Sequence, residues 1–151
     1  MTFSRYLSHD RVVFLSARSK DEALKALVSR LAGAVSPFEP DDLLERLHER
    51  EGLMSTGIGL GIGVPHLRYK GVKEPCIVIG LQPQGIEDYE SMDGEPVKIL
   101  VLILVGEGQH REYLRILSGV VKALKREEVR KALLSARSPE EVVDVLKRED
   151  D

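Results

Sequence analysis

Two histidines offer the clearest chemistry in this chain. His66 follows Pro65 at the end of a glycine-rich stretch, and His110 comes shortly after the apolar run 97–105. A neutral imidazole, with an ordinary pKa of about 6.5, is a good nucleophile near neutral pH. Histidine can therefore carry a phosphoryl group covalently. Because each histidine stands at a junction between an apolar strand pattern and the next segment, we expect both to converge at one sheet edge.

A phosphorylated histidine needs donors for its phosphoryl oxygens, and a second histidine and an arginine can supply them. Here the candidates are His110 and Arg50. Each candidate also has a structural interpretation. His66 can be an ordinary residue at a strand end, His110 a polar residue that opens a helix, and Arg50 a cation placed favourably at a helix C-terminus.

The glycines before His66 suggest a backbone with one open face. They alternate with aliphatic residues at positions 57, 59, 61 and 63. This spacing does not match the dinucleotide-binding fingerprint, and the lysine of a phosphate-binding loop is absent. No helical pattern follows to offer an N-terminus to a pyrophosphate. A nucleotide site is therefore disfavoured, and we expect the glycines to clear side chains from around His66.

Metal sites are also disfavoured by the sequence. His110-Arg111-Glu112 imitates the start of the zinc-deaminase motif, but Cys76 is the only cysteine, so the paired cysteines of that motif are missing. His48-Glu49 begins a metalloprotease motif that lacks its second histidine. We expect no metal, no cofactor and no internal disulfide. Cys76 is expected to pack as a small apolar residue.

The elements that must position these residues alternate between strands and helices. Strands are predicted over 11–15, 76–81 and 97–105, the last as a central strand covered on both faces. Capping signals at Ser19 and Ser138 and a proline at Pro40 predict helix starts, and further helices follow from about His110. The segment 82–94 is expected to be irregular. The pattern predicts one α/β domain over residues 1–151, with a mixed β-sheet flanked by helices on both faces.

Composition excludes several function classes. The chain has 22 basic and 25 acidic residues, a formal net charge of -3, and both signs are interspersed. This balance, with aromatic residues at only 5%, argues against nucleic-acid binding. The N-terminus lacks the apolar core of a secretory signal, and no run approaches transmembrane length. We therefore expect a cytoplasmic protein without direct membrane insertion.

Several motifs together resemble one known family. The chain is similar to the fructose, mannitol and nitrogen-related class (type 2) of enzyme IIA domains of the bacterial phosphoenolpyruvate-dependent phosphotransferase system. That family combines an Arg-Glu pair, a Ser-Thr-Gly step, an aliphatic-glycine repeat ending in Pro-His, an aspartate before an apolar strand, and a second histidine followed by Leu-x-x-Leu. The matching residues are Arg50-Glu51, Ser55-Thr56-Gly57, Ile58-Gly59, Ile62-Gly63-Val64-Pro65-His66, Asp93, His110, Leu114 and Leu117.

The resemblance implies a fold and a phosphoryl-carrier function. His66 would accept a phosphoryl group from HPr or a nitrogen-branch analogue, and then pass it to a cysteine of an enzyme IIB domain for sugar uptake. Alternatively, the phosphorylation state would regulate other proteins, with no transport role. His110 and Arg50 would hold the phosphoryl oxygens, and Thr56 would donate one more hydrogen bond. An apolar rim would form part of the partner surface; its predicted members are Ile58, Leu60, Val64 and Leu67.

Two positions depart from the family pattern beside the presumed nucleophile. Gly63 replaces the usual alanine, and Leu67 replaces the small residue that normally follows the histidine. Leu67 adds bulk where a phosphocarrier would dock. A third possibility therefore stays open: a degenerate member that binds partners without being phosphorylated.

Overall fold

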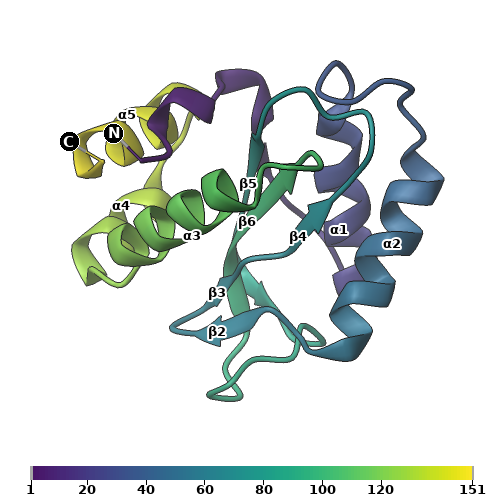
Figure 1. Cartoon of the computed structure of the whole chain (residues 1–151). Helices are drawn as coiled ribbons and strands as arrows, with labels where there is room; N and C mark the ends of the chain where they lie inside the picture. The colour runs from purple at the N-terminus through teal and green to yellow at the C-terminus, as the bar shows by residue number, and fades with distance from the viewer. Residues whose placement is uncertain (1, 151) are drawn as a thin grey trace.

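A six-stranded mixed sheet lies at the centre of the molecule (Figure 1). The computed structural model describes residues 2–150. The strand order is β1-β5-β6-β3-β2, and β4 also pairs with β6. β6 runs antiparallel to β5 and parallel to β3 and β4, so the sheet is mixed as predicted. The strands are β1 Val12–Phe14, β2 Gly57–Gly59, β3 Ile62–Gly63, β4 His66–Arg68, β5 Cys76–Ile86 and β6 Val97–Val105.

Helices cover both faces of the sheet. On one face lie α1 (Lys20–Val28) and α2 (Pro40–Leu53); on the other lie α3 (His110–Leu124), α4 (Glu127–Ser135) and α5 (Pro139–Glu149). The predicted starts are confirmed, since Ser19 and Ser138 accept hydrogen bonds from the third backbone N–H of their helices. Short 3-10 turns complete the described chain at Ser4–Tyr6, His9–Arg11 and Ser29–Leu31. Across residues 2–150, no helix combines the length and hydrophobicity needed to span a membrane.

β6 is the central strand that the sequence predicts. Its side chains alternate between two cores because successive residues of a strand point to opposite faces. Ile99, Val101 and Ile103 pack with α3, α4 and α5, whereas Leu100 and Leu102 pack with α1 and α2. Covering both faces explains why the strand is a nearly continuous apolar run.

β3 and β4 are two pieces of one interrupted strand beside β6. Gly63 pairs with Leu100 and His66 pairs with Ile103, so the register of the two pieces is the same. Pro65 has no N–H to donate, but its carbonyl still accepts from the N–H of Ile103 at 2.9 Å. The chain therefore passes Pro65 without losing register, and His66 becomes the first residue of β4.

The structure corrects the prediction for 82–94. β5 continues to Ile86, which pairs with Val97 after a register shift. Gln82 is buried in this strand because its side-chain amide forms hydrogen bonds with both the N–H and the C=O of Ala17, at 2.7 and 2.9 Å. A polar side chain is tolerated there because its hydrogen-bonding groups have partners. The expected irregular conformation was wrong for 82–86.

The glycines before His66 form a tight hairpin rather than a cleared surface. An ideal Cβ on Gly57 would lie 2.2 Å from the Glu90 carbonyl oxygen, and one on Gly63 would lie 2.7 Å from Cδ2 of Leu100. Gly59 and Gly61 take positive φ angles of 94° and 76° around the turn between β2 and β3. The glycines thus permit close packing and a sharp turn. The expectation that they clear space around His66 was wrong.

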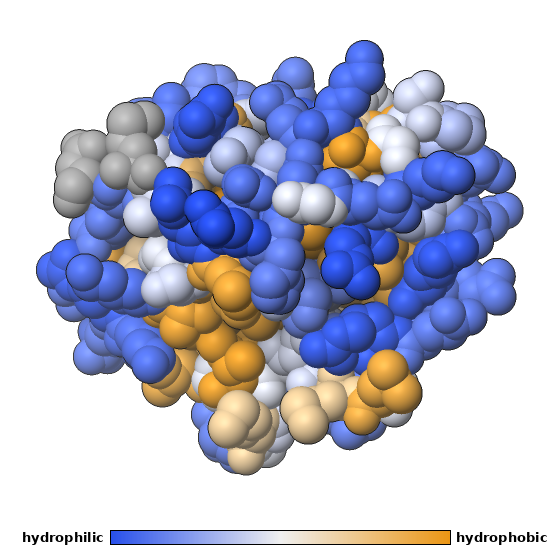
Figure 2. Space-filling view, viewed as in Figure 1, coloured by the Kyte–Doolittle hydropathy of each residue, from blue (hydrophilic) through white to orange (hydrophobic). Residues whose placement is uncertain are grey.

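Apolar side chains gather on one part of an otherwise largely hydrophilic surface. Figure 2 shows them along the lower part of the visible face, where Figure 1 places the β2–β3 hairpin and the end of α2. The large exposed hydrophobic residues in or close to these elements are Leu53, Met54, Leu60 and Met92.

Candidate functional site

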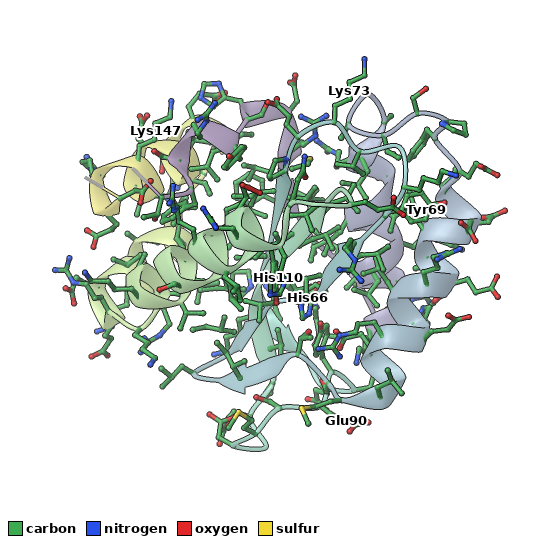
Figure 3. The ribbon with its side chains drawn as sticks, viewed as in Figure 1. His66, Tyr69, Lys73, Glu90, His110 and Lys147 are labelled. Carbon is green, nitrogen blue, oxygen red and sulfur yellow. The ribbon has the colours of Figure 1, made fainter. Side chains whose placement is uncertain are left out.

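One small cavity brings together three of the four residues predicted to act on phosphate. His66, His110 and Arg50 all line it, and its volume is about 220 Å³. The three residues come from β4, the start of α3 and the last turn of α2. His66 and His110 lie next to each other near the centre of Figure 3. The remaining lining residues are Leu67, Arg68, Val105 and Tyr113.

The imidazole of His66 is held in one tautomer. Its Nδ1 lies 3.1 Å from the carbonyl oxygen of Val64. A carbonyl only accepts hydrogen bonds, so Nδ1 carries the proton and Nε2 keeps a free lone pair. Burial and the nearby Arg50 cation lower the pKa of His66, and they outweigh the Val64 hydrogen bond and Glu51, which act in the opposite direction. A neutral imidazole with a nucleophilic Nε2 is the result.

His110 is placed by the loop that starts α3. The side chain of Gln109 bridges this loop, accepting from the N–H of Gly106 at 2.6 Å and donating to the carbonyl of Lys73 at 2.7 Å. His110 is the first residue of α3 and is exposed. The positive end of the helix dipole therefore lies at the cavity, where an anion would be stabilised.

Arg50 projects from the last turn of α2. One of its Nη atoms donates to the carbonyl of Met54 at 3.1 Å, which satisfies part of the helix C-terminus. None of the ion pairs formed within residues 2–150 involves Arg50. No acidic side chain of the described residues therefore neutralises its guanidinium, and its remaining N–H groups can donate beside His66.

Thr56 lies outside the cavity, in a buried network. Its hydroxyl donates to Oε2 of Glu51 at 2.6 Å and lies 2.8 Å from the hydroxyl of Tyr89. Glu51 also pairs with Lys20 at 2.8 Å. Burial alone would raise the pKa of Glu51, but the hydrogen bonds from Lys20 and Thr56 outweigh it and the net shift is downward. The hydroxyl proton of Thr56 is therefore committed to Glu51, and this arrangement corrects the expected contact with phosphate.

Two polar residues of the cavity, Tyr113 and Arg68, were not predicted from the sequence. Tyr113 stands three positions after His110 on α3, so both side chains fall on one helix face. That spacing was available from the sequence. Arg68 follows His66 by two positions on β4, which places the two side chains on the same face of the strand.

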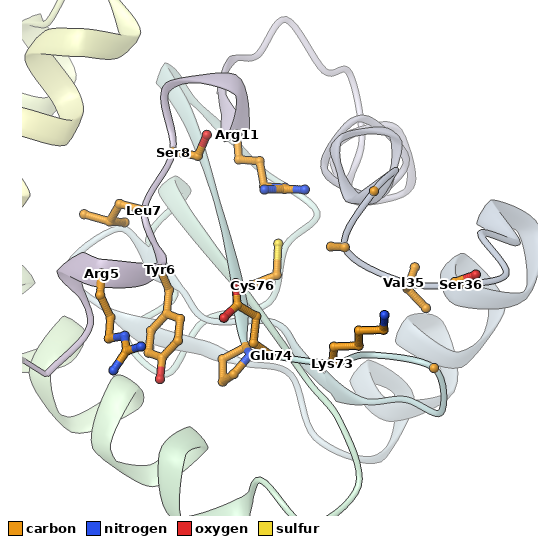
Figure 4. A pocket seen from close by; sticks show the side chains of 14 residues that line it. Arg5, Tyr6, Leu7, Ser8, Arg11, Val35, Ser36, Lys73, Glu74 and Cys76 are labelled. Atoms are coloured by element: carbon orange, nitrogen blue, oxygen red, sulfur yellow. The ribbon is translucent and has the colours of Figure 1, made fainter.

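A larger groove, of about 640 Å³, contains none of the predicted residues (Figure 4). It lies among the N-terminal turns, the segment 33–36 and the segment 71–76. Cys76 is one of its lining residues, and burial raises the pKa of that thiol. Unlike the cavity, the groove has no histidine among the described residues that line it. Across residues 2–150, no cluster of three or more His, Cys, Asp or Glu side chains is arranged to hold a metal ion.

The family of the chain follows from comparison with known proteins. Residues 5–149 match the model of the family described as phosphoenolpyruvate-dependent sugar phosphotransferase system, EIIA 2. The chain belongs to this family. It is accordingly an EIIA phosphoryl carrier of the phosphotransferase system, with the single α/β fold of its relatives.

Both branches of the EIIA family are represented among the curated relatives. A fructose-specific EIIA component from Haloferax volcanii is 38% identical over 128 residues, covering 85% of this chain and 82% of the relative. A nitrogen regulatory protein from Pseudomonas aeruginosa is 33% identical over 128 residues, with the same coverage of both chains. The two relatives therefore carry different functions at similar sequence distance.

Solved EIIA structures share the fold. The crystal structure of nitrogen regulatory protein IIA-Ntr from Neisseria meningitidis superposes with a TM-score of 0.88 at 27% identity, covering 97% of this chain and 99% of that one. A complex of mannitol enzyme IIA with phosphorylated enzyme IIB from Escherichia coli gives 0.76 at 23% identity, covering 94% of this chain and 97% of that one.

The structure accounts for the two departures from the EIIA pattern. Leu100 and Val97 fill the space in which an alanine Cβ at position 63 would sit, so glycine matches this core. Leu67 is half-buried against the core on the α1–α2 side while it lines the cavity. Two residues predicted for the apolar rim differ in exposure. Leu60 is exposed, whereas Val64 is buried in the core that packs against α3, α4 and α5. Val64 was therefore wrongly assigned to the rim.

Proposed function

We propose that Nε2 of His66 accepts the phosphoryl group. The observation that carries this proposal is the hydrogen bond from Nδ1 to the Val64 carbonyl, which leaves the lone pair of Nε2 free in the cavity. A phosphorylated HPr-like carrier would be the donor. The bond from phosphorus to Nε2 forms as the bond from phosphorus to the donor's histidine breaks, and the proton stays on Nδ1, which donates it in the hydrogen bond to the Val64 carbonyl.

The surroundings of His66 suit a phosphoryl group. Arg50 brings a guanidinium that is free of acidic partners among residues 2–150 and can form bidentate hydrogen bonds with phosphate oxygens. His110 adds a ring donor, and the start of α3 adds a partial positive charge. These groups are in place before the transfer, so they stabilise the moving negative charge without reorganisation.

The onward acceptor in this proposal is a cysteine of an enzyme IIB domain. The fructose-specific relative and the mannitol IIA–IIB complex support it. The exposed apolar side chains Leu53, Leu60 and Met92 supply a surface for brief docking of such partners. The transfer would take place in the cytoplasm.

A regulatory function is the second candidate. It is favoured by the TM-score of 0.88 to a nitrogen regulatory protein at nearly full coverage of both chains. In this case phosphorylation adds a double negative charge to the half-buried side chain of His66 and changes which proteins dock at the cavity.

Labelling of His66 tests the proposal directly. The full chain is incubated with phosphoenolpyruvate, enzyme I and HPr, with a nitrogen-branch carrier in parallel, and acid-labile phosphate is measured. We expect the wild type and the control His48→Ala to be labelled and His66→Ala to remain unlabelled. His48 is a matched control because it is a surface histidine on α2 that pairs with Asp21 at 2.7 Å. Labelling of His66→Ala would refute the assignment.

Two further variants test the supporting residues. Arg50→Ala and His110→Ala should fold normally and accept phosphate on the order of tenfold to a thousandfold more slowly. Unchanged rates of phosphoryl acceptance in both variants would show that neither side chain acts on the phosphoryl group. Failure of wild type to label with either carrier, combined with labelling of Leu67→Gly, would instead identify a chain that binds partners without phosphorylation.

Addition of an enzyme IIB domain separates transport from regulation. The phosphorylated protein is mixed with a fructose-type IIB domain, and the phosphoryl group is followed from His66 to the IIB cysteine. Rapid transfer supports the transport function. Retention of the phosphoryl group on His66, with altered binding of other proteins, supports the regulatory one.

A further inference from the structure

Tyr113 packs against both histidines of the cavity. The centroid of its ring lies 4.9 Å from that of His66, with the two planes tilted by 33°. The centroid of the His110 ring lies 6.1 Å away, with a tilt of 36°. These separations fall within the range of favourable contacts between aromatic rings. A single side chain on the first turn of α3 therefore touches both the proposed nucleophile and its neighbour.

The ring of Tyr113, rather than its hydroxyl, is the part that contacts His66. Tyr113 is half-buried, and no hydrogen bond within residues 2–150 involves its hydroxyl. Burial raises the pKa of this hydroxyl, against the opposing effect of Arg50, so the side chain is neutral at physiological pH. An uncharged aromatic ring beside His66 excludes water from one side of the imidazole.

Excluding water has two consequences for His66. The charged form of the imidazole is disfavoured, which keeps Nε2 available as a nucleophile. A water molecule is also kept from approaching a phosphoryl group on the ring from that side. Contact with the ring further limits rotation of the imidazole away from the carbonyl of Val64, the acceptor for Nδ1.

We propose that Tyr113 is the positioning residue of this site: its ring holds the imidazole of His66 against Val64 and shields it from water. The effect on the free imidazole is independent of any phosphoryl transfer. The effect on phosphohistidine rests on the proposed function of His66.

The experiment on the free protein measures the pKa of His66 by NMR. Tyr113→Ala should raise the pKa of His66 by roughly 0.5, toward its ordinary value, because one side of the ring becomes hydrated. Tyr113→Phe keeps the ring and should leave the value unchanged. Leu117→Ala is the matched control, because it removes a half-buried apolar side chain one turn further along α3 and outside the cavity.

The second measurement follows the half-life of the phosphorylated protein at neutral pH. Tyr113→Ala should lose its phosphoryl group several-fold faster than wild type, Tyr113→Phe and Leu117→Ala. An unchanged pKa in Tyr113→Ala, or an equal shift in Tyr113→Phe, would overturn the proposal. If His66 is never phosphorylated, the proposed function fails, but the pKa comparison still decides whether Tyr113 positions the ring.

Discussion

Two glycines five positions apart should respond oppositely to alanine substitution. Gly57 lies in β2, where an added Cβ would meet the carbonyl oxygen of Glu90 at 2.2 Å. Gly52 lies within α2, and nothing approaches its added Cβ within 4 Å. Gly52 lies two residues after Arg50, and Gly57 lies in the β2–β3 hairpin that leads to His66. The pair therefore isolates the effect of close backbone packing from that of replacing glycine.

The magnitude at Gly57 follows from the contacts that must open. A carbon normally approaches a carbonyl oxygen to about 3.3 Å, so the backbone of Glu90 would have to move by roughly 1 Å. That movement weakens the hydrogen bonds from Met92 N–H to the Gly57 carbonyl and from Ser55 Oγ to the Glu90 carbonyl, now 3.1 and 2.6 Å. With about 1 kcal/mol lost in all as the two hydrogen bonds weaken, and about 1–3 kcal/mol for overpacking, Gly57→Ala should lower the free energy of unfolding by about 2–4 kcal/mol.

Gly52→Ala should raise the free energy of unfolding by about 0.5–1 kcal/mol, because alanine favours a helix interior. Urea unfolding followed by circular dichroism measures both values. At about 2–4 °C per kcal/mol, the thermal midpoints of the two variants should differ by at least about 5 °C. Equal midpoints, or a stabilised Gly57→Ala, would refute the tight contact between the hairpin and the segment around Glu90.

Three other predictions concern charged groups. The pKa of His66 is lowered in the folded state, so the stability that its neutral imidazole contributes should be lost as pH falls below about 6.5. Phosphoryl acceptance should persist through that pH. His66→Gln should remove the pH-dependent part of the free energy of unfolding in urea titrations at pH 5–7. Glu51→Gln removes the carboxylate that pairs with Lys20 in a buried network and should cost about 2–4 kcal/mol, measured by urea unfolding. Asp150→Ala removes the acceptor for the N–H groups of Thr2, Phe3 and Ser4 and should cost about 1–2 kcal/mol. Burial opposes the lowered pKa of Asp150, but these hydrogen bonds outweigh it, so this loss should shrink below about pH 4.

Local patterns predicted most of the fold. The apolar run 97–105 is buried on both faces of β6, and the capping serines Ser19 and Ser138 begin α1 and α5. These signals depend on residues close together in the sequence, so they can be interpreted without knowing the fold. The end of β5 was missed because Gln82 is satisfied by Ala17, which lies 65 residues away.

The site was predicted in part, for a related reason. The chemical types of His66, His110 and Arg50 allow phosphate chemistry, the motif around them favours it, and the fold brings all three to one cavity. Thr56 has the right chemistry as well, but Glu51 and Tyr89 occupy its hydroxyl. Residue type shows what a side chain can do, whereas the partners that it meets depend on packing.

The order and types of the residues were enough to indicate the strands, the helices and the side chains able to carry a phosphoryl group. Which nitrogen of His66 is free follows only from the folded chain, because it depends on the carbonyl of Val64 lying 3.1 Å from Nδ1. The same is true of the close packing of the glycines against Glu90 and Leu100, and of the contact between Tyr113 and His66. Each of these features is a distance of a few ångströms between atoms whose separation is set by the way the β2–β3 hairpin, β4, β6, α3 and the segment around Glu90 pack together.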